Sequence, residues 1–201
     1  LLVLAVAETL AEAGIGAAIV WRDSPVEDSA PVALAIGLIT GGGIAAALVL
    51  MAPAIATFFG TPEAAGIVQV LAICVVLGVP ASVFAGILQK RMQFGRRAVP
   101  EVARALAKGA VGIPLALAGA GAWSLVFSHL AGVVVGLVLL WRMSPWRPRL
   151  SLRRDVLRDV LPYGVQIAAV GLVGLAIRKL DVVVVGHSFD AGQLGLYTLA
   201  F

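Results

Sequence analysis

Charged residues and cysteine are scarce in this sequence of 201 residues. Only 13% of the residues are charged and 61% are hydrophobic, with a mean hydropathy of +1.03. Soluble domains carry roughly 25% charged residues, so this composition excludes an ordinary soluble protein. The single cysteine, Cys74, lies in an apolar run, which excludes a disulfide framework and makes Cys74 a core residue.

Catalytic and cofactor motifs are missing as well. The sequence has no phosphate-binding glycine loop, no metal-ligand spacing, and no nucleophile beside a base in a polar loop. The net charge of +4 comes from basic residues in two short clusters between apolar stretches, where membrane topology explains them. We therefore predict a protein that is not an enzyme, holds no cofactor or metal, and binds no nucleic acid.

Long apolar stretches dominate the chain. About 20 apolar residues, at 1.5 Å rise each, span the roughly 30 Å core of a bilayer. We predict an all-α, polytopic transmembrane helix bundle of about six spans plus the start of a seventh, and Pro31 should lie in the first turn of the second span. The predicted spans are residues 1–20, 32–59, 64–88, 98–119, 123–141 and 161–186, with the next one starting at 194.

Lys and Arg residues alternate between successive loops. Four lie in residues 89–97 and six in 142–158, whereas the turns at 60–63, 119–122 and 187–193 have none. Because cytoplasmic loops carry the excess of Lys and Arg, these two loops are predicted to be cytoplasmic in a multi-pass membrane protein. Residues 151–160 form an amphipathic pattern that fits either a helix lying on membrane lipids or a solvated connector.

Several ionisable residues lie inside the predicted spans, where each charge costs about 2.5–3.5 kcal/mol. They are Glu8 and Glu12 in the first span, Glu101, Arg104 and Lys108 in the fourth, and Arg178, Lys179 and Asp181 in the sixth. In one interpretation Glu101 pairs with Arg104, and Asp181 with Arg178, within their own helices. In the other, the four cations line a cavity for an anionic ligand, and the acids are counter-charges or proton carriers.

Four stretches resemble a known family of transporters. They are LAEAGIGAAIVWR (10–22), GILQKRMQF (86–94), GAGAWSLV with LLWRMSPWRPRL (119–150), and RKLDVVVVGHSFDAGQLGLYTLAF (178–201). In their order and spacing they resemble the Wzx-type oligosaccharide flippases of the multidrug/oligosaccharidyl-lipid/polysaccharide exporter superfamily. Transporters of this kind are built from repeated halves.

The resemblance implies a domain organisation. Residues 1–142 would be spans two to six of the N-terminal lobe, residues 143–158 a basic cytoplasmic connector, and residues 159–201 the start of the C-terminal lobe. The chain is then expected to be an internal fragment of a two-lobed transporter.

The resemblance also implies a function and an inner-membrane location. The family translocates undecaprenyl-pyrophosphate-linked oligosaccharide across the cytoplasmic membrane for polysaccharide biosynthesis, with polysaccharide polymerase machinery as a further partner. A multidrug or small-solute exporter of the same superfamily remains an alternative. A membrane enzyme of glycan assembly is a third possibility, but it would need a large external loop that this sequence does not contain.

Overall fold

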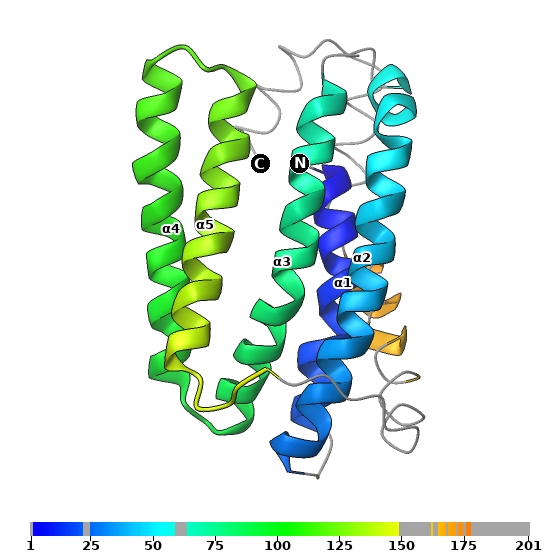
Figure 1. Cartoon of the computed structure of the whole chain (residues 1–201), viewed down its shortest axis with the longest axis vertical. Coiled ribbons are helices and arrows are strands. Elements are labelled where there is room, and N and C mark those ends of the chain that lie inside the picture. The colour runs from blue at the N-terminus through cyan, green and yellow to red at the C-terminus, as the bar shows by residue number, and fades with distance from the viewer. Residues whose placement is uncertain are drawn as a thin grey trace.

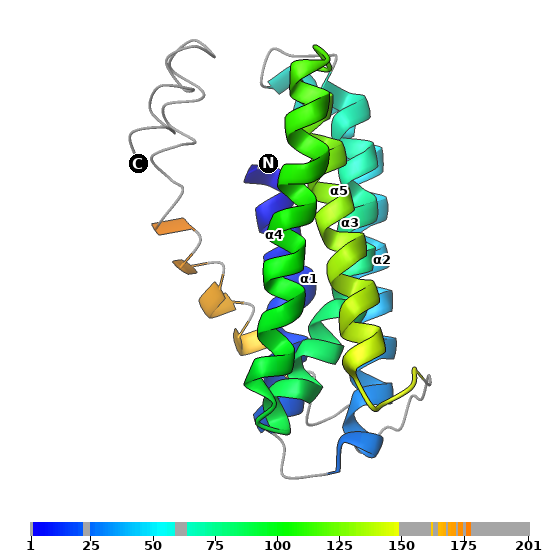
Figure 2. The same cartoon turned by 90° about the vertical axis from the view of Figure 1, so that its left-hand side faces the viewer.

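Five helices stand side by side with roughly parallel axes (Figures 1 and 2). The computed structural model describes residues 2–21, 25–58 and 64–148, with scattered helical positions between 162 and 177. Every regular element in these residues is a helix, which confirms the prediction of an all-α protein. The helices are α1 (Leu2–Trp21), α2 (Val26–Phe58), α3 (Ala64–Lys90), α4 (Phe94–Leu117) and α5 (Ala122–Met143).

Three of these helices are long and apolar enough to cross a membrane, namely residues Val26–Thr57 of α2, all of α3 and all of α5. Helices α1 and α4 have 20 and 24 residues, which corresponds to about 30 and 36 Å at 1.5 Å per residue. The predicted spans at 161–186 and from 194 lie outside the described residues, apart from the scattered positions up to 177.

Helix α2 begins six residues earlier than predicted, so the expectation that Pro31 occupies its first turn is wrong. The amides of Asp28 and Ser29 donate to the carbonyl of Pro25, at 3.1 and 3.4 Å, and close the first turn there. Glu27 and Asp28 lie in this turn, where carboxylates are stabilised by the positive end of the helix dipole. Pro31 therefore lies inside α2, after its first turn, and its side chain is buried.

The basic loop predicted at 89–97 is also shorter in the structure. Helix α3 continues to Lys90 and α4 begins at Phe94, so Arg97 is part of a helix. Met92, with φ of 55°, makes the tight turn between them, and the amide of Gln93 donates to the carbonyl of Leu88 at 2.9 Å. Arginine is a good helix former, which is why α4 extends back through its basic residues.

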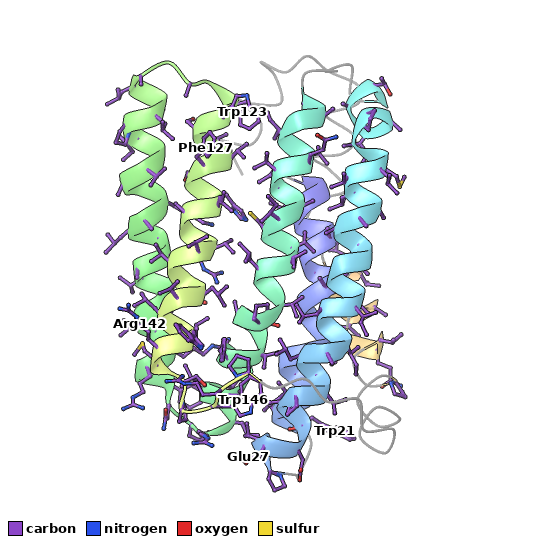
Figure 3. The ribbon with its side chains drawn as sticks, viewed as in Figure 1. Trp21, Glu27, Trp123, Phe127, Arg142 and Trp146 are labelled. Atoms are coloured by element: carbon purple, nitrogen blue, oxygen red, sulfur yellow. The ribbon has the colours of Figure 1, made fainter. Side chains whose placement is uncertain are left out.

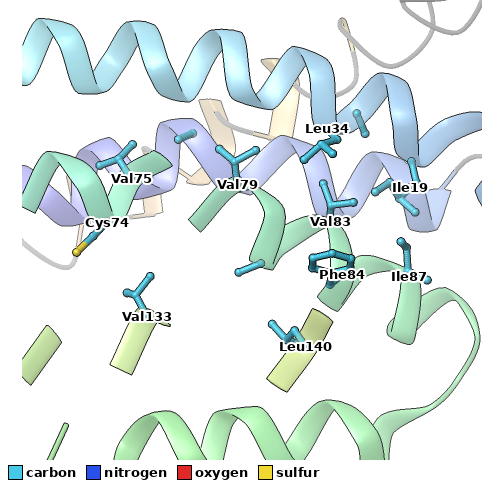
Figure 4. Packing of buried hydrophobic residues seen from close by; sticks show 14 of the residues in the cluster. Ile19, Leu34, Cys74, Val75, Val79, Val83, Phe84, Ile87, Val133 and Leu140 are labelled. Atoms are coloured by element: carbon cyan, nitrogen blue, oxygen red, sulfur yellow. The ribbon is translucent and has the colours of Figure 1, made fainter. Parts of the chain in front are cut away.

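Helix α3 lies at the centre of the bundle and contacts the four other helices. Its buried face includes Val75, Val79, Val83 and Ile87, which pack with residues from its neighbours (Figure 4). Helix α1 approaches α3 closely, because a Cβ on Gly86 would lie 2.9 Å from the carbonyl oxygen of Gly16. Small residues permit such contacts between membrane helices, which pack mainly by van der Waals attraction.

The segment after α5 folds back against the end of the bundle. Trp146 is only 7% exposed, and its ring meets Phe84 of α3 edge-on, with 5.9 Å between centroids. Arg147 donates to the carbonyls of Trp141 and Ser144, at 3.1 and 3.2 Å, which fixes the turn. Figure 3 shows Trp146 at the same end of the bundle as Glu27, and opposite the end that carries Trp123.

Candidate functional site

A cavity of about 560 Å³ lies between α1, α3, α4 and α5. Helices α1 and α4 do not contact each other along their described residues, so the cavity occupies the space between them. Trp21 and Gln89 lie on its wall, and both are at or near the ends of their helices. The cavity therefore reaches the end of the bundle at which Trp146 lies.

The cavity wall is unevenly polar. Helices α1 and α3 contribute mostly small or apolar side chains, such as Gly16, Ala17 and Ala85. Helix α4 contributes Arg97, Glu101 and Arg104. Two cations and one carboxylate leave this wall with a net positive charge, which favours an anionic ligand.

Neither arginine of this wall forms an ion pair in the part of the chain that the structure describes, and Arg104 also has an unsatisfied donor. Its Nε atom is buried and makes no hydrogen bond. Among the described residues no ion pair joins Arg104 to Glu101, although both line the cavity. The structure therefore does not contain the intrahelical Glu101–Arg104 pair that was one interpretation of the sequence. A buried Nε–H that lacks a hydrogen-bond partner costs free energy.

Arg97 was not predicted as a site residue, because it was assigned to a loop. Its Nη1 donates to Oε1 of Gln89 on α3, so this guanidinium is already engaged. With α4 beginning at Phe94, Arg97 lies on the same helical face as Glu101 and Arg104, at spacings of four and seven residues. A predicted start of this helix at residue 94 instead of 98 would have identified Arg97 as a candidate site residue.

Lys108 does not line this cavity, but it turns towards the bundle interior. It is partly buried, and its stem packs where a Cβ on Gly132 of α5 would lie. The hydroxyl of Ser128 on α5 donates to the carbonyl of Lys108 at 2.9 Å, which brings this part of α4 close to His129. In the same region Nε2 of His129 on α5 lies 3.0 Å from Oε1 of Glu8 on α1, so this contact joins two helices.

The other predicted site residues are not placed by the structure. Arg178, Lys179 and Asp181 lie outside the described residues, and so does the side chain of Glu12. In the parts of the chain that are described, no group of three His, Cys, Asp or Glu side chains could hold a metal ion.

Comparison with known proteins places the chain in a family. A family profile described as "Polysaccharide biosynthesis protein" matches residues 1–201, the whole chain. The chain belongs to this polysaccharide biosynthesis family. No solved structure matches it significantly.

Curated relatives of the polysaccharide biosynthesis family are similar along most of this chain. The teichuronic acid biosynthesis protein TuaB of Bacillus subtilis is 24% identical over 97% of this chain and 41% of its own length. The succinoglycan biosynthesis transport protein ExoT of Rhizobium meliloti is 27% identical over 83% of this chain and 33% of its own. The lipopolysaccharide biosynthesis protein WzxC of Escherichia coli is 23% identical over 100% of this chain and 41% of its own. The chain thus spans less than half the length of these relatives.

Proposed function

We propose that this chain forms part of a membrane flippase that translocates a lipid-linked oligosaccharide across the cytoplasmic membrane for polysaccharide biosynthesis. Family membership over residues 1–201 and the transport role in the name of ExoT support this proposal. Undecaprenyl pyrophosphate is the lipid carrier proposed for the sugar, and a polysaccharide polymerase is a proposed partner. The protein would be multi-pass, with about six spans in this chain.

The position of Arg104 on the cavity wall is the observation that supports the proposal most directly. The Arg104 guanidinium lines a cavity of about 560 Å³, and its buried Nε has no hydrogen-bond partner. Arginine binds phosphate oxygens through planar, charge-assisted hydrogen bonds that strengthen away from water. A pyrophosphate head in this cavity would satisfy the guanidinium, while the sugar occupies the open end and the prenyl chain stays in the lipid.

The remaining charges take proposed supporting roles. Lys108 would offer a second cation about 6 Å farther along α4, by helical rise. Glu101, Glu8 and Glu12 would act as counter-charges or carry coupling protons. Arg178, Lys179 and Asp181 would complete the cavity from the second lobe, which begins near residue 159 after the connector at 143–158.

Charge neutralisation in the intact transporter tests this function. We expect Arg104→Gln to lower polysaccharide export in the host organism by about tenfold or more, the loss that follows from removing a charged hydrogen bond. Arg91→Gln is the matched control, because Arg91 lies outside the cavity and pairs at 3.1 Å with the exposed Glu27. Membrane insertion of both variants is checked by immunoblotting of membrane fractions. Wild-type export by Arg104→Gln would contradict the proposal.

A further inference from the structure

Two glycines of α5, Gly132 and Gly136, lie against the side chains of Lys108 and Arg104 from α4. A Cβ on Gly136 would lie 2.9 Å from Nε and 3.1 Å from Nη2 of Arg104. A Cβ on Gly132 would lie 2.7 Å from Cγ and 2.9 Å from Cε of Lys108, and 3.2 Å from Cγ of Arg104. The two glycines are four residues apart on one face of α5, as the two cations are on α4, and both glycines are buried.

The atoms that fill these spaces distinguish this pair from other glycines in the bundle. At Gly86, a Cβ would meet the backbone of Gly16, so that glycine allows two helices to approach. At Gly136, the three nearest atoms all belong to the guanidinium of Arg104. Glycine inside a helix costs about 1 kcal/mol relative to alanine, so its presence here does not help α5 itself.

We propose that Gly136 and Gly132 are positioning residues for Arg104, which lines the cavity, and for the neighbouring cation Lys108. By leaving room against α5, Gly136 lets the guanidinium of Arg104 lie flat on that helix at the edge of the cavity, and Gly132 does the same for the stem of Lys108. Any larger residue at 136 displaces the guanidinium, because the contact would be shorter than real Cβ contacts. The inference rests on the proposed function, since it concerns how the same anion site is held.

Gly136→Ala gives a clean test because the atoms it displaces are the far end of a flexible side chain. The helix should therefore remain folded while the guanidinium moves. Gly109→Ala on α4 is the matched control, since nothing lies within 4 Å of the Cβ it would add. Binding of geranyl pyrophosphate, a short prenyl pyrophosphate, to the purified intact protein is measured by isothermal titration calorimetry.

A double-mutant cycle separates positioning from general packing. Arg104→Gln and Gly136→Ala should each weaken binding by about tenfold or more, and Gly109→Ala by less than about twofold. In the Arg104→Gln background, Gly136→Ala should cause no further loss, because the group it displaces is gone. Additive losses, or full binding by Gly136→Ala beside a defective Arg104→Gln, would overturn the positioning role alone.

Two further outcomes of the binding experiment also test the proposal. Unchanged binding by Arg104→Gln would overturn the anion site itself and with it the proposed function. If Gly136→Ala does not yield folded protein, the same cycle is run with Gly132→Ala and Lys108→Gln. Additivity in that cycle overturns the inference, and loss of binding by Gly132→Ala only when Lys108 is present supports it.

Discussion

The crossing of α1 and α3 offers a quantitative test of the packing. In Gly86→Ala the new Cβ would lie 2.9 Å from the carbonyl oxygen and 3.1 Å from Cα of Gly16. These are backbone atoms, so neither helix can relieve the contact by rotating a side chain, and the helices must separate. Overpacking of this kind costs about 1–3 kcal/mol.

Alanine also has a higher helix propensity than glycine, which stabilises the variant and partly offsets the packing cost. A control variant with the same gain in helix propensity is therefore needed. Alanine gains about 1 kcal/mol over glycine inside a helix. Gly42→Ala in α2 receives the same gain, and its Cβ would meet nothing within 4 Å. The difference in the free energy of unfolding between the two variants is therefore the packing term alone, about 1–3 kcal/mol in favour of Gly42→Ala.

Unfolding of the intact protein in detergent micelles, followed by circular dichroism during titration with SDS, measures this difference. Both variants are prepared in the same micelle composition and compared with the wild type. We expect Gly42→Ala to equal or exceed the wild type, and Gly86→Ala to fall below Gly42→Ala. Equal stability of the two variants would refute the backbone contact between α1 and α3.

Two further contacts are open to similar measurements. Trp146→Ala should lower the free energy of unfolding by about 3–5 kcal/mol, because Trp146 is buried against Phe84. Trp123 is 39% exposed, so Trp123→Ala should lower the free energy of unfolding by clearly less. Equal losses at the two tryptophans would contradict the buried position. Glu8→Ala and His129→Ala should each lower the free energy of unfolding by about 1–3 kcal/mol, but not additively in the double variant. Additive losses would mean that the 3.0 Å contact is not formed.

Sequence reasoning located the helices well where apolar runs were uninterrupted. The third predicted span, 64–88, ends two residues short of α3, and the fifth, 123–141, lies within α5. The predicted starts of α2 and α4 were wrong, because Glu27 and Arg97 were assigned to loops. Carboxylates and arginines are nevertheless compatible with the first turn of a helix. The lost turn in α4 is also why Arg97 was missing from the candidate site.

The site could be predicted only in part. Helical spacing placed Glu101 and Arg104 on one face, and the structure finds both at one cavity. The same spacing suggested that they pair with each other, and in the described residues they do not. Sequence spacing shows which side chains share a face, but it does not give the rotamers that decide between an ion pair and a cavity wall.

By itself, the sequence determined the all-helical architecture. Apolar segments in lipid must satisfy their backbone hydrogen bonds internally, and a helix does this whatever its neighbours are. Only the tertiary structure decided which helices meet, and therefore that Glu8 contacts His129, 121 positions away, and that Arg104 rests on Gly136. These contacts depend on how each helix is rotated about its axis, which close packing of small side chains sets and no local pattern encodes.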